Sequence, residues 1–334
     1  MNSNEMMRAA WFDDFGSAQM VLKLGDFLKP SAGPGEVLVK LHASGVNPSD
    51  VKKRAGSFPD LLDAGPVIPN SDGAGIIEAV GAGVPESRVG ERVWIYQAQF
   101  ARQHGTAAEY VAIDSSRAII LPDNTGFDVG ACIGIPMMTA HRCVFADGEV
   151  DGQSVLVTGG AGRVGHYAIQ WASQAGANVI ASASNDIDIA ACKAAGASKV
   201  VNHRDNQFAT AVLDANKGVP LDRVIDVEFG ANLDTSINVC RVGGTIATYS
   251  SAAAPNPKIP FYQMMYKDLV LRFVIVYAMP ESAKEAATQD IQTALEKNLL
   301  QHRISNSVPL KDIVEANELI ETGKIRGCVV LKIN

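Results

Sequence analysis

The chain has 334 residues, of which 47% are hydrophobic and 19% charged, a composition typical of a globular protein and a length that favours two domains. The net charge is −7 and there is no basic patch, so we expect no nucleic-acid partner. No signal-peptide pattern is present, and the most apolar long segment, 269–279, contains Arg272 and is too short to span a bilayer. We therefore expect no membrane association. The five cysteines are scattered without a CxxC pair, which favours free thiols in a reducing cytoplasm.

Short alternating strands separated by glycine and proline characterise residues 1–126. The clearest strand patterns lie at 34–48, 73–85, 90–97 and 107–114. Many short strands between turn residues are typical of a partly closed β-barrel.

From about residue 127 the pattern changes to apolar strands that alternate with helices. Continuously apolar, β-branched runs lie at 153–158, 177–183, 198–202, 222–227, 243–250 and 268–277. The alternation predicts a parallel sheet covered by helices on both faces. Six such strands are the number that a dinucleotide-binding Rossmann domain needs.

The C-terminal part is predicted to contain a helix over 281–297, a helix over 311–322 and a final strand at 328–333. These elements could extend the Rossmann sheet or return to the first domain, and the pattern leaves both arrangements open.

A glycine-rich segment joins the first Rossmann strand to a helix and consists of Gly159, Gly160, Ala161, Gly162, Arg163, Val164 and Gly165. Gly159 would permit a tight turn, Gly162 a close approach of backbone amides to a pyrophosphate, and Gly165 close packing of helix on strand. The pattern is weak alone, but a strand precedes it, a helix follows, and further βα units come after. We predict a dinucleotide site here; a purely structural turn is the alternative.

The second Rossmann strand ends without the acidic residue that enzymes preferring NAD use to bind the ribose hydroxyls. Ser182 and Ser184 leave room there for a 2′-phosphate, and His203 and Arg204, just after the third strand, could supply positive charge. Two nearby acidic residues would repel a phosphate: Asp186 and Asp188. We predict NADPH as the cofactor, with NADH as the alternative.

Several motifs follow one another in a fixed order from about residue 30 onward. They are HASGVNPSD (42–50), PNSDGAGIIEAVGAGV (69–84), GTAAEYV (105–111), GACIGIPMMTAHR (130–142), the glycine loop and ASKVVNHRD (197–205). In this order and spacing the chain resembles the zeta-crystallin-like quinone oxidoreductases, a zinc-free branch of the medium-chain dehydrogenase/reductase superfamily.

The resemblance implies an α/β protein with a GroES-like β-barrel catalytic domain (1–126 and 279–334) and a doubly wound Rossmann domain (127–278). It further implies a cleft between the domains and NADPH-dependent reduction of a quinone or a related conjugated carbonyl. Members of this family are usually homodimers or homotetramers, and the last Rossmann strand is a natural edge for pairing between subunits.

The residues at the family's zinc positions differ in this chain. Zinc-dependent relatives carry a cysteine where this chain has Asn47 and a His-Glu pair where it has Ser71 and Asp72. Neither Asn47 nor Ser71 is a suitable zinc ligand, and the six histidines form no HxxxH or HExxH pattern. We therefore predict direct hydride transfer without a metal.

Three side chains are candidates for the chemistry. Asn47 could donate to a quinone carbonyl or to the nicotinamide amide, or simply form an Asx turn before a proline. Lys52 could stabilise an anionic product, or be a solvated lysine in a charged run. Thr139 lies where the family places a residue near the nicotinamide, or is a hydroxyl inside a helix.

Backbone contacts to the cofactor are also expected at the fifth Rossmann strand. Gly243 and Gly244 begin this strand and Ser250 ends it, and ligands bind at the carboxyl edge of such sheets. No residue stands out as a general acid, so the final proton could come from solvent.

The sequence thus predicts an NADPH-dependent quinone oxidoreductase. Two alternatives remain: reduction of activated C=C bonds, as in enones and 2-alkenals, and a nicotinamide-binding sensor or structural protein with little turnover.

Overall fold

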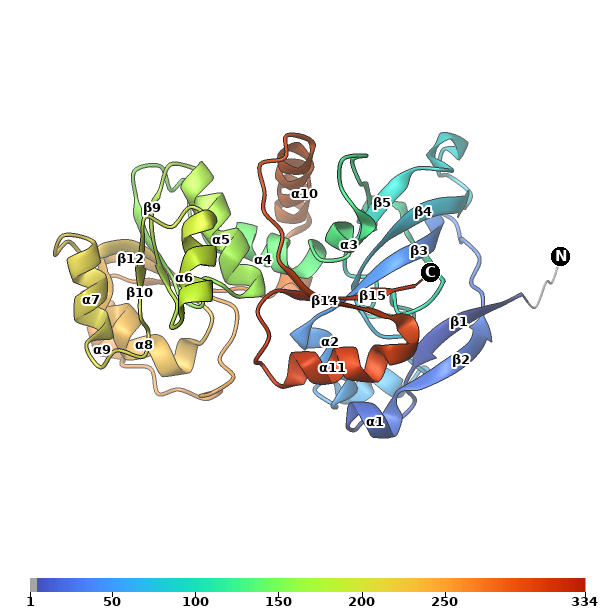
Figure 1. Cartoon of the computed structure of the whole chain (residues 1–334), viewed down its shortest axis with the longest axis horizontal. Coiled ribbons are helices and arrows are strands. Elements are labelled where there is room, and N and C mark those ends of the chain that lie inside the picture. The colour runs from blue at the N-terminus through green and yellow to red at the C-terminus, as the bar shows by residue number, and fades with distance from the viewer. Residues whose placement is uncertain (1–4, 334) are drawn as a thin grey trace. The chain divides into compact units, whose positions relative to one another are not determined.

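The computed structural model describes residues 5–333, which form two compact units. Within this range, the first unit comprises residues 5–135 and 288–333, and the second comprises Pro136–Ala287 (Figure 1). These boundaries differ from the expected ones, 126/127 and 278/279, because two helices each continue from one unit into the other: α4 (Gly134–Phe145) and α10 (Glu281–Glu296). Within residues 5–333, no helix combines the length and apolarity needed to cross a membrane.

The first unit is built on a seven-stranded sheet with the order β14-β15-β3-β4-β5-β7, in which β6 also pairs with β3. All neighbours are antiparallel except β14 and β15, and a separate hairpin pairs β1 with β2. The strands are β1 (Met6–Trp11), β2 (Lys23–Leu28), β3 (Glu36–Val46), β4 (Asp72–Val80), β5 (Arg92–Ile95), β6 (Tyr110–Asp114), β7 (Ala118–Ile120), β14 (Ile304–Pro309) and β15 (Cys328–Lys332). This is the GroES-like half of the predicted fold.

The C-terminal tail returns to this first sheet. Strand β15 pairs antiparallel with β3, with Val329 opposite Val46, and four of its five residues are buried. The tail therefore belongs to the first unit, as the family resemblance implies, and does not extend the Rossmann sheet. The hairpin β1–β2 has no counterpart among the predicted elements.

Four short helices complete the first unit: α1 (Ala18–Val21), α2 (Pro48–Arg54), α3 (Phe127–Gly130) and α11 (Ile313–Glu321). Helix α2 begins at Pro48 because Asn47 is its N-cap and proline suits the first helical position. The buried Arg54 at its end donates to Asn317 Oδ1 at 3.3 Å and pairs with Glu321. These contacts fix α2 against α11 and so hold the residues that α2 carries.

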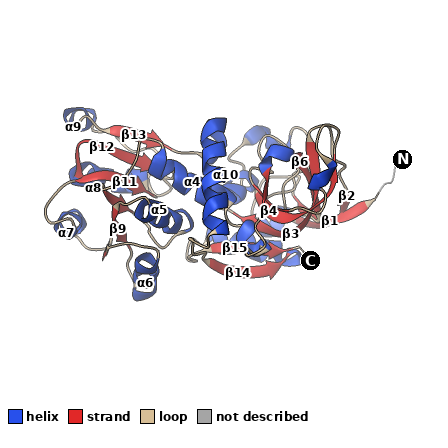
Figure 2. Ribbon diagram, turned by 90° about the horizontal axis from the view of Figure 1, so that it is seen from above, coloured by secondary structure: helices blue, strands red, loops and turns tan. Residues whose placement is uncertain are grey.

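The second unit contains a six-stranded parallel sheet with the order β10-β9-β8-β11-β12-β13. Numbered along this unit, the order is 3-2-1-4-5-6, the Rossmann arrangement that the sequence predicted. Helices cover both faces of the sheet (Figures 1 and 2). The elements are β8 (Ser154–Val157), α5 (Arg163–Gln174), β9 (Asn178–Ser182), α6 (Asp186–Ala194), β10 (Lys199–Val201), α7 (Phe208–Ala215), β11 (Leu221–Asp226), α8 (Phe229–Val239), β12 (Cys240–Thr248), α9 (Phe261–Tyr266) and β13 (Val270–Phe273).

The strand order of this sheet reverses between β8 and β11. Ligands of open α/β sheets bind at such a switch point, outside the carboxyl ends of the strands. Here those ends are Val157 and Asp226, and the glycine-rich segment directly follows the first of them.

Candidate functional site

The glycine loop (residues 159–165) connects β8 to α5. Gly159 has φ = 60°, a conformation that glycine adopts without strain. A Cβ on Gly165 would lie 2.4 Å from the Gly159 carbonyl oxygen, so only glycine allows the helix to begin this close to the turn. Helix α5 has Gly162 as its N-cap, without a side-chain cap and without an acidic residue in its first turn. Backbone amides at such a helix start are suited to bind a pyrophosphate.

Ser182 has a different role from the predicted one. Its side chain is buried, its Oγ accepts a hydrogen bond from Gly159 N at 3.0 Å, and its carbonyl accepts one from Gly160 N at 3.1 Å. The hydroxyl therefore holds the start of the glycine loop instead of facing a 2′-phosphate. Ser184, two residues later, is half-buried and is the hydroxyl that remains for a ligand at this strand end.

The acidic residues after β9 are not equivalent. Asp188 is buried in the first turn of α6, where its carboxylate accepts from Asn185 Nδ2 at 2.8 Å and its N–H donates to Asn185 Oδ1 at 2.9 Å. Asp186 is exposed. Of these two residues, only Asp186 is exposed to solvent. The electrostatic repulsion of a phosphate should therefore be weaker than the sequence suggested.

His203 and Arg204 are exposed and follow β10. Strand β10 pairs with β9 so that Val201 lies opposite Ser182, and the carboxyl ends of parallel strands share one edge. The two basic residues and Ser184 therefore lie at the same edge of the sheet, as the sequence predicted.

Gly243 and Gly244, predicted to contact the cofactor, do not lie at the carboxyl edge of the sheet. Strand β12 begins at Cys240, and its register with β11 shifts before Thr245, so both glycines lie in an irregular stretch near the amino end. Gly243 has φ = 69°, typical of a β-bulge, and its N–H donates to Lys267 O. The carboxyl edge is roughly 13 Å away, at ~3.3 Å per residue.

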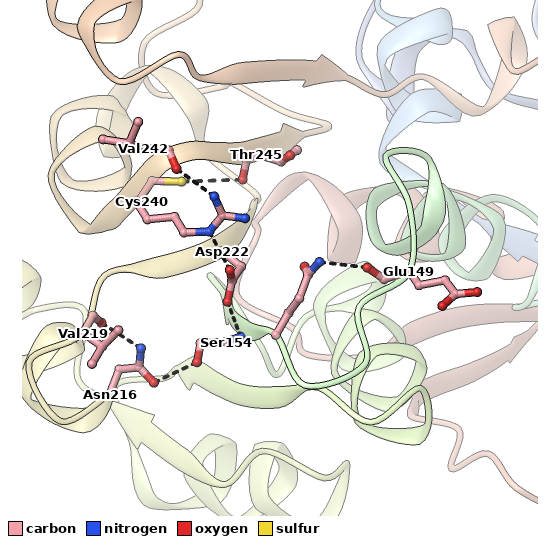
Figure 3. Close-up of polar contacts among 10 residues, drawn as sticks. Glu149, Ser154, Asn216, Val219, Asp222, Cys240, Val242 and Thr245 are labelled. Atoms are coloured by element: carbon pink, nitrogen blue, oxygen red, sulfur yellow. Dashed lines mark hydrogen bonds and ion pairs between the residues drawn. The ribbon is translucent and has the colours of Figure 1, made fainter.

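At the amino edge of the sheet, side chains and backbone groups hydrogen-bond to one another (Figure 3). Asp222 accepts from Ser154 N at 2.8 Å and from Arg241 Nε at 2.6 Å. Asn216 Oδ1 accepts from Ser154 Oγ at 3.0 Å. These polar groups are satisfied within the fold, which fits a structural edge.

At the opposite edge, the ends of β12 and β13 border a pocket of about 570 Å³. The Ser250 carbonyl accepts from Phe229 N at 2.9 Å and from Thr248 Oγ1 at 3.3 Å, which fixes the backbone beside it. The predicted residue Ser250 thus lies at a pocket on the ligand-binding edge. The lining residues are mainly apolar, with a few hydroxyl and amide groups: Phe229, Thr248, Tyr249, Ser250, Ser251, Pro255, Asn256, Pro257, Ile259, Phe273, Val274 and Ile275.

In the first unit, Asn47 belongs to a buried polar cluster. Its Nδ2 donates to Asp72 Oδ2 at 2.9 Å, and its backbone N–H donates to Asp50 Oδ2 at 2.9 Å. Ile135 N also donates to Asp72 Oδ2 at 2.9 Å, whereas Asp72 Oδ1 is buried without a hydrogen-bond partner in residues 5–333. Asn47 is thus the N-cap of α2, and its amide is oriented by Asp72.

The lysine inside this cluster is Lys53, not the predicted Lys52. Lys52 is exposed, whereas Lys53 is only 4% exposed. Lys53 Nζ donates to Gln99 O and, at 3.4 Å, to Ser71 Oγ. The spacing of Asn47, Asp50 and Lys53 places all three on one face of α2, a signal that the sequence contained.

Burial dominates the ionisation of the cluster. It raises the pKa of Asp72 to about 8, helped by the Asp50 charge and opposed by the hydrogen bonds from Ile135 and Asn47. Burial likewise raises the pKa of Asp50 to about 6 against the lowering effect of Lys53, and it lowers the pKa of Lys53. Burial therefore favours the protonated, uncharged form of Asp72.

Thr139 is buried within α4 and belongs to the second unit. In the described range 5–333, no group of three or more His, Cys, Asp or Glu side chains is arranged to hold a metal ion. Each unit therefore has its own candidate residues: the polar cluster in the first unit, and the glycine loop and pocket in the second.

Known proteins resemble the chain over nearly its whole length. Residues 33–123 match a family described as "Alcohol dehydrogenase GroES-like domain", and residues 164–293 match "Zinc-binding dehydrogenase". The chain is 30% identical to a quinone oxidoreductase of Mus musculus over 96% of this chain and 97% of that protein. A quinone oxidoreductase of Rattus norvegicus is 28% identical over 98% of each chain. A mycobacterial protein solved in complex with NADPH has a TM-score of 0.86 and 28% identity, covering 98% of this chain and 100% of its own.

Proposed function

The chain belongs to the zeta-crystallin-like quinone oxidoreductases of the medium-chain dehydrogenase/reductase superfamily, and we propose that it reduces a quinone with NADPH. It is an oxidoreductase that uses a nicotinamide cofactor. The proposal rests on two features of the second unit that occur together. The glycine loop is suited to bind a pyrophosphate, and the end of β9 lacks an acidic residue.

The second unit fits the cofactor. Side chains at Gly159 and Gly165 would collide with Val227 and with the loop itself, so the loop keeps its backbone amides accessible. When bound, NADPH supplies the hydride. The amides at the start of α5 would bind the pyrophosphate, and the pocket beside Ser250 would hold the nicotinamide end.

The preference for NADPH is supported by the charge at the carboxyl ends of β9 and β10. Ser184, His203 and Arg204 lie there beside two exposed carboxylates, Asp186 and Asp205. A 2′-phosphate would gain hydrogen bonds and an ion pair at this edge.

The proposed reaction needs no metal. Amide and hydroxyl groups at Asn47 and Ser71 are poor zinc ligands, and Asn47 is already bonded to Asp72. We assign the second N–H of the Asn47 amide to the acceptor's carbonyl oxygen, where it would stabilise the developing negative charge. Asp72 orients this amide, and Thr139 is retained as a candidate contact to the nicotinamide.

We also propose a homodimer or homotetramer that pairs through β13. This strand ends the Rossmann sheet, and Val270, Phe273 and Ile275 on and after it are 42%, 63% and 54% exposed. An unpaired edge with exposed apolar side chains favours pairing with a second copy. A reducing, cytoplasmic location is supported by the cysteines, which are all buried free thiols.

The test is steady-state turnover of NADPH and NADH with 1,4-benzoquinone, naphthoquinones and 2-alkenals. The proposal expects the highest kcat/KM with NADPH and a quinone. Faster reduction of alkenals would replace the quinone by an activated C=C bond, and tight NADPH binding without turnover on any acceptor would indicate a sensor or structural protein.

A further inference from the structure

The segment Asp226–Gly230, which leads from β11 into α8, contacts both loops that border the candidate cofactor site. On one side, Asp226 Oδ1 accepts from Thr158 Oγ1 at 2.7 Å, and Val227 N donates to that same hydroxyl at 2.9 Å. Thr158 directly precedes the glycine loop. This end of the segment therefore fixes the start of the pyrophosphate loop.

On its other side the segment holds the pocket loop, which we define as residues 250–260. The Glu228 carboxylate accepts from two successive backbone amides, Ala252 N at 3.0 Å on Oε2 and Ala253 N at 2.9 Å on Oε1. Hydrogen bonds to an ionised carboxylate are roughly twice as strong as neutral ones. Glu228 thus binds this loop with both of its oxygens.

Gly230 brings the same loop into direct contact with the start of α8. Its N–H donates to Ser251 Oγ at 2.9 Å, and that hydroxyl donates to Ala254 O at 2.5 Å. A Cβ on Gly230 would lie 2.2 Å from Ala254 O, so a larger residue would push the loop away. The close approach depends on glycine at this position.

The pocket loop has few other anchors. Ala252 and Ala253 are exposed and carry only methyl groups, so side-chain packing contributes little to their position. A loop with exposed backbone and few buried contacts opens easily unless hydrogen bonds hold it. Between Ser251 and Pro255, two residues that line the pocket, the loop is therefore restrained by the two bonds to Glu228 together with the bond from Ser251 Oγ to Ala254 O.

The two ends of the segment are spaced to suit a dinucleotide. The glycine loop follows β8 and the pocket loop follows β12, with β11 alone between these strands. At ~4.8 Å between neighbouring strands, the two loops start roughly 10 Å apart. A nicotinamide riboside can span such a separation from the pyrophosphate to its ring.

We propose that Glu228 is a positioning residue for the nicotinamide end of the cofactor. It acts through the pocket loop, which it holds at the carboxyl end of β12, and does not itself touch the ligand. The inference rests on the proposed function in one respect, since it takes the ligand to be a nicotinamide dinucleotide.

The test compares two ligands that share the pyrophosphate but not the ring. Dissociation constants for NADPH and for 2′-phospho-ADP-ribose, which lacks nicotinamide, are measured by calorimetry on wild type, Glu228→Ala and Glu228→Gln. The control is Asp234→Asn, which removes an exposed carboxylate from the same helix. Melting temperatures verify that each variant is folded.

We expect Glu228→Ala to weaken NADPH binding about tenfold, equivalent to ~1.4 kcal/mol, and to leave 2′-phospho-ADP-ribose binding unchanged. Glu228→Gln should lie between, because its amide offers one acceptor oxygen instead of two. Without ligand, hydrogen exchange of the Ala252 and Ala253 amides should accelerate most in Glu228→Ala and less in Glu228→Gln. Asp234→Asn should match wild type in every measurement.

Equal affinities of wild type and Glu228→Ala for NADPH would overturn the inference, as would an equal loss for both ligands. Unchanged exchange at Ala252 and Ala253 would overturn it as well. If wild type bound neither ligand, the proposed function would fall and this inference with it, so the two failures are distinguishable.

Discussion

Replacement of Asp72 by asparagine should change how the stability of the first unit depends on pH. The Asp72 carboxyl is completely buried, and burial raises its pKa from 3.8 to about 8. The folded state thus binds a proton that the unfolded state has already lost across this range. The stabilising effect is fully present below about pH 4 and is lost as the pH rises through about 8.

The size of the effect follows from the two pKa values. Each pKa unit corresponds to about 1.4 kcal/mol, so the wild-type unit should lose roughly 6 kcal/mol of stability between the two limits. The asparagine side chain of the variant cannot ionise, so the variant should lose this slope and keep only the smaller contribution of Asp50, whose pKa is about 6. The new amide can still accept the bonds from Asn47 and Ile135, but its NH₂ replaces Asp72 Oδ1, which has no partner. In acid the protonated wild-type carboxyl also presents a donor at this position, so the variant should be about as stable as the wild type in acid and more stable at alkaline pH.

Urea denaturation at a series of pH values measures this directly. A Trp171→Phe background removes the tryptophan of the second unit and leaves Trp11 and Trp94 as fluorescent reporters of the first. The matched control is Asp63→Asn, an exposed carboxylate of the same unit. If the Asp72→Asn unit kept the wild-type slope, or if it were not the more stable of the two at alkaline pH, the argument from burial would be refuted.

Three further predictions concern the second unit. Ser182→Ala removes the acceptor for Gly159 N and should weaken NADPH binding several-fold in calorimetry, because the freed amide loosens the glycine loop at a cost of about 1–3 kcal/mol; an unchanged affinity would mean that the loop holds its shape alone. Arg204→Ala should lower kcat/KM for NADPH but not for NADH, and an equal decrease for both would remove this arginine from the 2′-phosphate site. Phe273→Lys, which places a charge on the exposed edge strand, should shift the molar mass in light scattering from oligomer to monomer, whereas an unchanged mass would place the interface elsewhere.

The sequence by itself determined most of the second unit. All six Rossmann strands and the glycine loop were predictable because buried parallel strands are continuously apolar and because the loop needs glycine at fixed positions. The edge that collects Ser184, His203 and Arg204 was also predictable, since strand direction and order are set by the βαβ connections.

Contacts between distant parts of the chain decided the rest. Whether Lys52 or Lys53 enters the cluster depends on the phase of α2, and Lys53 is fixed by Gln99, which lies 46 residues away. Ser182 is turned into the fold by Gly159, and Gly243 and Gly244 lie at the amino edge because β12 begins early and contains a bulge. The tail joins the first sheet because β15 finds its partner in β3. The periodicity of the sequence predicts which residues are buried. A buried polar group also needs a hydrogen-bond partner, and only the tertiary structure determines which group that partner is.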